Sequence, residues 1–152
     1  MKKFIVFSIV LLILSAIQSC KKDGESSARI DMKELWDCNA AQNFDSAKLA
    51  SKLIGAWKWT AQSCYGSGYK TNLADKNVKV TFTSTGTFTV MENSIIVTQG
   101  NWKLKIQDVT IYGLDLDHTS EYLHGRILLC DNRVLFNASY IDGCDNLFVR
   151  IP

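Results

Sequence analysis

Proline and histidine are scarce in this sequence, which has one proline and two histidines among 152 residues. A single proline and nine glycines exclude collagen-like and proline-rich linker architectures. The histidines, His118 and His124, do not have the spacing of a metal site such as HExxH, so we expect both to be solvated. The sequence also has no Gly-Xaa-Ser-Xaa-Gly motif, no phosphate-binding loop and no nucleophile near a base. We therefore expect a protein that is not an enzyme and that holds no cofactor and no metal.

Three acidic residues, Asp115, Asp117 and Glu121, are the candidates for a calcium site, because carboxylate oxygens are ligands that Ca²⁺ prefers. They lack the glycine and the remaining ligand positions of an EF-hand loop. We interpret this stretch as a solvated loop.

The composition is that of one packed globular domain. Apolar residues make up 47% and charged residues 21% of the chain, which excludes intrinsic disorder. Lys2 and Lys3 lie in a segment that we expect to be removed, and the rest of the chain then carries 15 basic and 15 acidic residues. A nucleic-acid-binding protein needs a basic face that displaces counterions from phosphates, so we expect no nucleic-acid partner.

Residues 1–19 have the pattern of a secretion signal peptide. Two lysines precede an apolar run over residues 4–14, which is shorter than the roughly 20 residues that a membrane-spanning helix needs. The segment ends in Ser15-Ala16-Ile17-Gln18-Ser19-Cys20, which resembles the lipobox of bacterial lipoproteins. The resemblance implies that the signal peptide is cleaved and that Cys20 becomes an acylated N-terminus, which anchors the protein in a membrane.

The residues that follow Cys20 are polar and small, and we interpret residues 20–28 as a flexible tether. In Gram-negative lipoproteins an aspartate directly after the acylated cysteine often acts as an inner-membrane retention signal, and here that position is Lys21. The resemblance therefore implies an outer-membrane lipoprotein of the bacterial cell envelope, on either its periplasmic or its surface face. The alternative is an ordinary signal peptide with a chance cysteine at the cleavage point.

Four cysteines remain besides the lipidated one, and an even number in an exported chain implies two disulfides with three possible connectivities. The alternatives are four free thiols or a zinc site. Zinc-binding cysteines usually come in pairs separated by two to four residues, whereas these are scattered singly, at Cys38, Cys64, Cys130 and Cys144.

Residues 29–52 are the only part of the chain with a helical pattern. Asp45 is a capping residue, and Leu49 and Leu53 lie one helical turn apart, while residues 31–36 could form an earlier short turn. From there to the C-terminus, β-branched and aromatic residues alternate with polar ones, which predicts about nine strands joined by turns. We place this barrel domain at residues 53–152, with strands at 53–63, 77–83, 87–91, 95–99, 101–107, 109–114, 122–130, 133–141 and 146–151.

These strands are joined without crossover helices, and parallel pairing would need connections of a dozen residues or more. We therefore predict an all-β fold, an antiparallel up-and-down β-barrel of about eight to nine strands, which leaves no sheet edge open. A barrel of about eight strands has room inside for side chains or for one small ligand. Apolar side chains at alternate positions of these strands point to the same face and are predicted to fill the interior. They are Trp57, Trp59, Val80, Phe82, Phe88, Val90, Trp102, Leu104 and Ile106.

The residues Leu53-Ile54-Gly55-Ala56-Trp57, preceded by a short helix, resemble the Gly-Xaa-Trp motif that opens the lipocalin barrel. The hairpin over residues 80–88 and the segment Gly100-Asn101-Trp102-Lys103-Leu104 are also similar to small bacterial lipocalin-like lipoproteins. The resemblance covers residues 45–152.

The resemblance implies that Gly55 and Trp57 form a structural motif at the closed end of the barrel, where a cationic residue, Arg150, stacks on the Trp57 ring. The open end is then covered by the loop after the first strand, in which Tyr65 and Tyr69 flank Gly-Ser-Gly and could gate a pocket. The candidate ligand-binding residues are therefore Tyr65, Tyr69, Phe82, Phe88 and Trp102.

Two functions fit this fold. The first is a lipid-anchored lipocalin-like protein that buries a small hydrophobic or amphipathic ligand in an apolar cup. The second is a non-enzymatic structural or interaction module of an outer-membrane assembly, with a barrel filled by its own bulky side chains. An empty cavity of about 300 Å³ or more favours the first.

Barrel geometry selects one disulfide pairing. If the first strand runs upward, Cys64 lies at its top, and the last strand, its neighbour in a closed barrel of even strand number, begins at the same end near Cys144. The strand that ends at Cys130 also runs downward, so Cys130 lies at the bottom, within reach of the segment that carries Cys38. We therefore predict Cys64–Cys144 and Cys38–Cys130. A Cys130–Cys144 bridge is excluded, because the strand between them spans about 25–30 Å, whereas bridged Cα atoms lie within about 7 Å.

Overall fold

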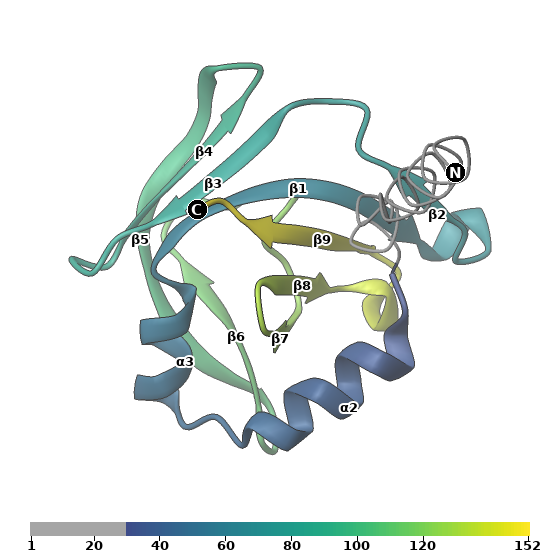
Figure 1. Ribbon diagram of the computed structural model, residues 1–152. Coiled ribbons are helices and arrows are strands. Elements are labelled where there is room, and N and C mark those ends of the chain that lie inside the picture. The colour runs from purple at the N-terminus through teal and green to yellow at the C-terminus, as the bar shows by residue number, and fades with distance from the viewer. Residues whose placement is uncertain (1–29) are drawn as a thin grey trace, which may run out of the picture.

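A computed structural model describes residues 30–152 as an antiparallel β-barrel with two helices packed against it (Figure 1). The elements are α2 (Met32–Gln42), α3 (Ser46–Leu53), β1 (Gly55–Cys64), β2 (Thr71–Leu73), β3 (Val78–Phe82), β4 (Thr87–Glu92), β5 (Ile95–Asp108), β6 (Ile111–Leu116), β7 (Arg126–Cys130), β8 (Arg133–Asn137) and β9 (Cys144–Arg150). The predicted signal peptide, Cys20 and the tether lie outside the described residues.

The strands close into a barrel in the order β1-β3-β4-β5-β6-β7-β8-β9, because β9 pairs with β1, and all of these pairings are antiparallel. The ninth strand, β2, pairs with residues 61–63 of β1, beyond the part of β1 that pairs with β3. The all-β, up-and-down barrel predicted from the sequence is therefore confirmed.

The barrel has two distinct ends. Cys64 at the end of β1 pairs with Cys144 at the start of β9, and we call this the disulfide end. At the opposite end, Gly55 pairs with Phe82 of β3, directly after α3, and we call this the motif end. Both predicted disulfides are present: Cys64–Cys144, with Cα atoms 4.0 Å apart, and Cys38–Cys130, with Cα atoms 5.6 Å apart.

Inward-facing side chains form the main core, and most of the predicted interior residues belong to it. Leu104 is partly buried at its edge. The prediction for Ile106 is wrong, because its side chain is 69% exposed. Strand β5 is a single strand of 14 residues rather than the two predicted, and beyond Trp102 it pairs with β6 but no longer with β4. The β5–β6 hairpin therefore projects past the barrel wall. There, an alternation of apolar and polar residues along the strand no longer places the apolar side chains in the barrel interior.

A β-bulge in β1 gives the protein a second core. Trp59 pairs with Phe148, but Ala61 pairs with Leu147, so Thr60 is an extra residue that reverses the facing of the strand. Trp59 therefore points into the barrel, whereas Ala61 packs on the outside under α2. The second core lies between α2 and the outer faces of β1, β7, β8 and β9, and its buried members are Leu35, Ala61, Leu128, Cys130, Leu135 and Leu147.

Both helices begin at aspartate caps. Asp31 accepts a hydrogen bond from the Glu34 N–H at 3.0 Å, and α2 runs for 11 residues, longer than the short turn expected there. Asp45 accepts from the Lys48 N–H at 2.7 Å and starts α3, which places Leu49 and Leu53 in the main core as predicted. No helix within residues 30–152 is long and apolar enough to cross a bilayer.

The disulfide end has more loop than predicted. Strand β7 begins at Arg126 rather than at residue 122, and β8 ends at Asn137 rather than at residue 141. After β8 the chain makes a 3₁₀ turn, whose Ser139 donates from both its N–H and its hydroxyl to the buried carboxylate of Asp145. The Asn137 side chain also donates to Asp145, so this carboxylate fixes the turn.

Candidate functional site

Aromatic side chains pack the lumen of the barrel. The Phe82 ring lies edge-on to Trp102, with ring centroids 5.3 Å apart, and Phe136 meets Phe148 in the same way at 5.7 Å. At the disulfide end, Tyr122 turns inward from the loop before β7 and lies edge-on to Trp59 at 5.3 Å. These contacts leave the centre of the barrel occupied by its own side chains. A filled barrel is what the sequence predicts for a structural or interaction module.

A polar chain seals the lumen at the disulfide end. The Tyr122 hydroxyl donates to the Glu92 carboxylate, which also forms an ion pair with Lys76 at 2.9 Å. Burial raises the pKa of Tyr122, and the hydrogen bond from Lys76 lowers the pKa of Glu92. The phenol therefore stays protonated and serves as a fixed donor to an ionised carboxylate.

The five candidate ligand-binding residues do not form one site. Tyr65 and Tyr69 lie at the disulfide end, are 53% and 56% exposed, and contact each other edge-to-face. Phe82, Phe88 and Trp102 are buried near the motif end. The tyrosine loop is therefore separated from the three interior rings by the packed lumen.

The Gly-Xaa-Trp motif and Arg150 do come together. The Arg150 guanidinium lies 4.2 Å from the centroid of the Trp57 ring, and Arg150 also donates to the carbonyls of Lys52 and Ile54. The Trp57 indole N–H donates to the Leu53 carbonyl at 2.8 Å. Arg150 and Trp57 thus satisfy carbonyls left free at the end of α3, and their role is structural.

The largest described cavity lies at the side of the barrel, where two strands separate. Strands β6 and β7 pair only at Gly113 and Arg126, and toward the motif end they diverge. The Leu129 N–H of β7 instead donates to the Asn39 side chain of α2 at 2.9 Å. A helix side chain thus replaces a strand partner, and space remains between α2 and the β5–β6 hairpin.

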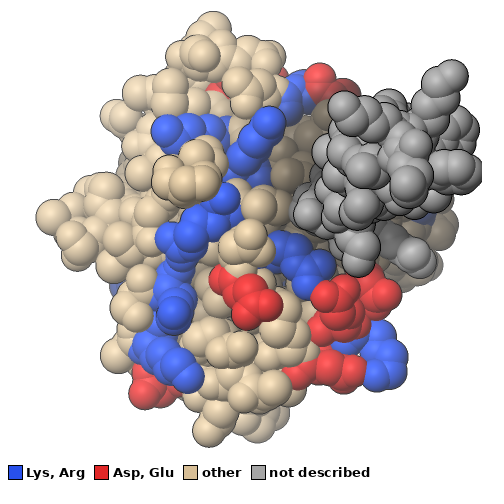
Figure 2. Space-filling view, in the orientation of Figure 1, with Lys and Arg blue, Asp and Glu red and all other residues tan. Residues whose placement is uncertain are grey.

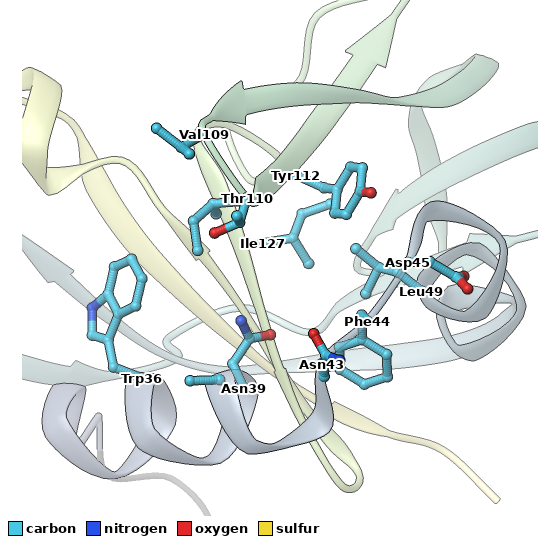
Figure 3. Close-up of a pocket in the computed structure, with 12 residues that line it drawn as sticks. Trp36, Asn39, Asn43, Phe44, Asp45, Leu49, Val109, Thr110, Tyr112 and Ile127 are labelled. Carbon is cyan, nitrogen blue, oxygen red and sulfur yellow. The ribbon is translucent and has the colours of Figure 1, made fainter.

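This lateral cavity has a volume of about 640 Å³. Figure 3 shows Trp36 and Asn39 pointing from α2 toward Thr110 at the tip of the β5–β6 hairpin. Its inner wall reaches the main core at Leu49 and Ile127. The complete lining is Trp36, Asn39, Ala40, Asn43, Phe44, Asp45, Leu49, Val109, Thr110, Ile111, Tyr112 and Ile127.

The sequence did not point to this cavity, although one signal was present. Trp36, Asn39 and Asn43 are spaced by three and four residues, which places them on one face of a helix. Because the sequence pattern predicts only a short turn around residues 31–36, it does not place these three side chains on one helical face. The opposite wall comes from residues 109–112, which the sequence pattern assigned to an ordinary strand.

An ion pair beside the cavity holds the hairpin in place. Arg126 contacts Asp108 at 2.7 Å, and its guanidinium lies 3.9 Å from the Tyr140 ring centroid and 5.9 Å from that of Trp36. The Gln107 side chain donates to the Tyr140 hydroxyl at 3.0 Å. Since Trp36 also lines the cavity, these contacts connect the position of the hairpin to the cavity wall.

The acidic group around residue 117 is engaged in local contacts. Asp117 accepts hydrogen bonds from the backbone N–H and the side chain of Asn101, which lower its pKa to about 2. Asp115 forms an ion pair with Lys103 at 3.2 Å, on the outer face of β5 and β6. Asp117 therefore braces β5 against the loop after β6, and Asp115 joins β5 to β6.

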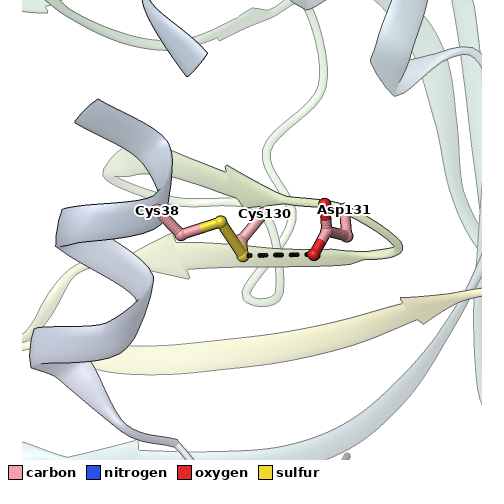
Figure 4. Close-up of side chains that lie close together, drawn as sticks. All are labelled: Cys38, Cys130 and Asp131. Atoms are coloured by element: carbon pink, nitrogen blue, oxygen red, sulfur yellow. Dashed lines mark hydrogen bonds between the residues drawn. A yellow bond between two sulfur atoms is a disulfide. The ribbon is translucent and has the colours of Figure 1, made fainter. Parts of the chain in front are cut away.

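Within residues 30–152, one grouping of potential metal ligands is present, Cys38, Cys130 and Asp131 (Figure 4). The two sulfur atoms form the disulfide, and a disulfide sulfur lacks the thiolate charge that binds metals. The grouping is therefore a structural bridge between α2 and β7.

No protein-family model, no curated protein and no solved structure matches the chain. The class of the protein thus rests on its own architecture, a closed eight-stranded antiparallel barrel consistent with a lipocalin-like fold.

Proposed function

We propose that the protein is a lipid-anchored envelope lipoprotein that binds a small amphipathic molecule in the lateral cavity, without acting on it as an enzyme. The observation that carries the proposal is the cavity itself. Its volume of about 640 Å³ falls in the range of roughly 300–1,000 Å³ that is typical of small-molecule sites.

The lining supports an amphipathic ligand. Trp36, Phe44 and Tyr112 offer aromatic surface, and Leu49 and Ile127 offer an apolar floor. The apolar part of the ligand is expected to lie on this floor, where it loses contact with water. Polar orientation comes from side chains at the rim and on α2, namely Asn39, Asn43, Asp45 and Thr110.

The charge of the lining favours a neutral or cationic ligand. Its one ionisable carboxylate is Asp45, and none of the lining residues is lysine or arginine. Lys48 is not part of the lining but lies at its rim, where its ammonium donates to the Gln42 carbonyl and lies 5.1 Å from the centroid of the Phe44 ring. An anionic head group placed beside Asp45 would meet a like charge in the lining itself, which disfavours fatty-acid anions.

Native mass spectrometry of protein purified from its own host tests the binding function. We expect a defined additional mass that organic extraction removes. Finding only the mass of the protein after gentle purification would contradict the proposal. The anchor is tested separately: Cys20→Ser should release the protein from membranes, and a variant that still needs detergent would show that the anchor lies elsewhere.

The second candidate, an interaction module of an envelope assembly, is supported by the packed lumen. It requires no cavity ligand. Absence of a copurified molecule, together with a stable protein partner captured by crosslinking in the envelope, would favour it over the binding function.

A further inference from the structure

Exposed apolar side chains are concentrated at the disulfide end of the barrel. Ten large hydrophobic side chains are exposed in the described part of the chain, and six of them belong to this end. They lie in two places, the β1–β2 loop with β2 and the start of β5. They are Tyr65, Tyr69, Leu73, Ile95, Ile96 and Val97.

Several of these side chains make little contact with the barrel and are largely exposed. Leu73 and Ile95 are 70% and 68% exposed, and Ile95, Ile96 and Val97 follow one another directly after a hairpin turn. Single exposed apolar residues are ordinary, but such a grouping marks an interaction surface. Tyrosines beside aliphatic side chains are the composition of a membrane interface, where amphipathic rings lie among the lipid head groups.

The chain enters the folded domain from this same end. Ile30 and Met32 pack against the second core, which includes Ala61 and Leu147 from the halves of β1 and β9 near the disulfide. Figure 1 shows the start of α2 beside the start of β9, whereas α3 lies at the far end. Residues 21–29 separate Cys20 from the described domain, and nine residues reach at most about 30 Å when fully extended.

We propose that the disulfide end of the barrel rests on the lipid bilayer, with Tyr65, Tyr69, Leu73 and residues 95–97 inserted among the head groups. The proposal rests on the lipid anchor of the proposed function, because a tether of this length keeps that end close to the membrane. The lateral cavity near the motif end then faces away from the bilayer and stays open to solutes.

Apolar contact, rather than charge, holds this end on the membrane. Lys76 is paired there with Glu92, and Lys70 is offset by Asp75 and Asp142 in the loops at the same end. Basic side chains instead gather in a band over β3, the start of β1 and α3, as Figure 2 shows. Docking through that band would present the flank of the barrel and would weaken as salt is added. Insertion of the disulfide end is expected to be insensitive to salt.

Site-specific photocrosslinking in the native envelope tests the proposal. A benzophenone amino acid replaces Ile96 in one variant and Ile106 in another, a matched position on the same strand that is 69% exposed, lies toward the opposite hairpin and does not line the cavity. Formation of both disulfides confirms that each variant is folded. We expect lipid adducts severalfold more abundant at position 96 than at position 106, and unchanged when isolated membranes are moved from about 0.01 M to 1 M salt.

Adducts at position 96 that contain only protein, either a partner or a second copy of this chain, would overturn the proposal, as would equal lipid labelling at both positions. Loss of the lipid adducts in high salt would instead favour docking on the membrane through the basic band. Mass spectrometry of the N-terminal peptide tests the lipid anchor separately from the docking of the disulfide end. An unmodified Cys20 refutes the anchor, whereas lipid labelling at position 96 still decides whether this end meets the bilayer.

Discussion

The Arg150 guanidinium lies over the indole ring of Trp57, 4.2 Å from its centroid, although the two residues are 93 positions apart in the sequence. They are direct partners in the pairing of β1 with β9. Gly55 leaves room for this contact, because its φ is +128° and a Cβ atom there would lie 2.6 Å from Arg150 Nη1. The three residues together join the end of α3 to the two strands that close the barrel.

Replacing Arg150 should therefore destabilise the whole domain. Arg150→Ala is expected to lower the free energy of unfolding by about 2–3 kcal/mol, because it removes a cation–π contact and two hydrogen bonds from a charged donor. Arg150→Lys should restore only part of the loss, since an ammonium cannot stack and bond both carbonyls as the planar guanidinium does. Denaturant unfolding measures both, with the exposed Lys58→Ala as the control. Equal stability of Arg150→Ala and Lys58→Ala would contradict this role.

Two residues of β5 should differ sharply in their effect on stability. Trp102 is 8% exposed and packs on Phe82, so Trp102→Ala should cost about 3–5 kcal/mol. Ile106 lies four residues further along and is 69% exposed, so Ile106→Ala should change stability by no more than about 0.5 kcal/mol. Thermal or denaturant unfolding of the pair measures the difference. A large loss for Ile106→Ala would place it in the core after all.

Acid should weaken the contact between Asp117 and Asn101. The pKa of Asp117 is lowered to about 2 in the folded protein, first by the hydrogen bond from the Asn101 side chain, against about 3.9 in an unfolded chain. Its stabilisation is therefore fully present above the unfolded pKa and is lost as the pH falls toward 2. The stability difference between the wild type and Asp117→Asn should shrink over that range. A difference that is constant from pH 6 to pH 2 would contradict the lowered pKa.

The sequence predicted the barrel and its disulfides because both follow from connectivity. Antiparallel strands with short turns must alternate in direction, and in a closed barrel with an even number of strands this places Cys64 and Cys144 at one end and Cys130 at the other. The pairing needed no side-chain detail. Cys38 required only that the segment before β1 return along the outside of the barrel, which α2 does.

Features that depend on local deviations from regular pairing were not predictable in this way. The bulge at Thr60 reverses the facing of β1, yet Trp59 and Ala61 keep the same alternation in the sequence. Ile106 alternates like a core residue because the pattern does not reveal where β5 leaves the barrel. The lateral cavity exists because β6 and β7 diverge after one pair, which is a property of long-range packing.

The charge preference of the cavity can be tested without disturbing α3. Asp45→Asn removes the carboxylate charge but keeps a side-chain oxygen that caps the helix about as well. We expect the wild type to bind dodecylamine more tightly than dodecanoate, measured by the change in tryptophan fluorescence. Asp45→Asn should reduce this preference severalfold while thermal stability stays near that of the wild type. Tighter binding of dodecanoate by the wild type would contradict a neutral or cationic ligand.

The most direct test of ligand binding in the lateral cavity uses two neighbouring alanines of α2. Ala40 lines the cavity and Ala41 does not, and both are exposed. Each is replaced by tryptophan, and native mass spectrometry measures the copurified mass on protein from the original host. The account predicts that the wild type and Ala41→Trp carry the ligand and that Ala40→Trp, equally folded, has lost it. Retention of the same mass by Ala40→Trp would show that the ligand binds elsewhere and would contradict the account.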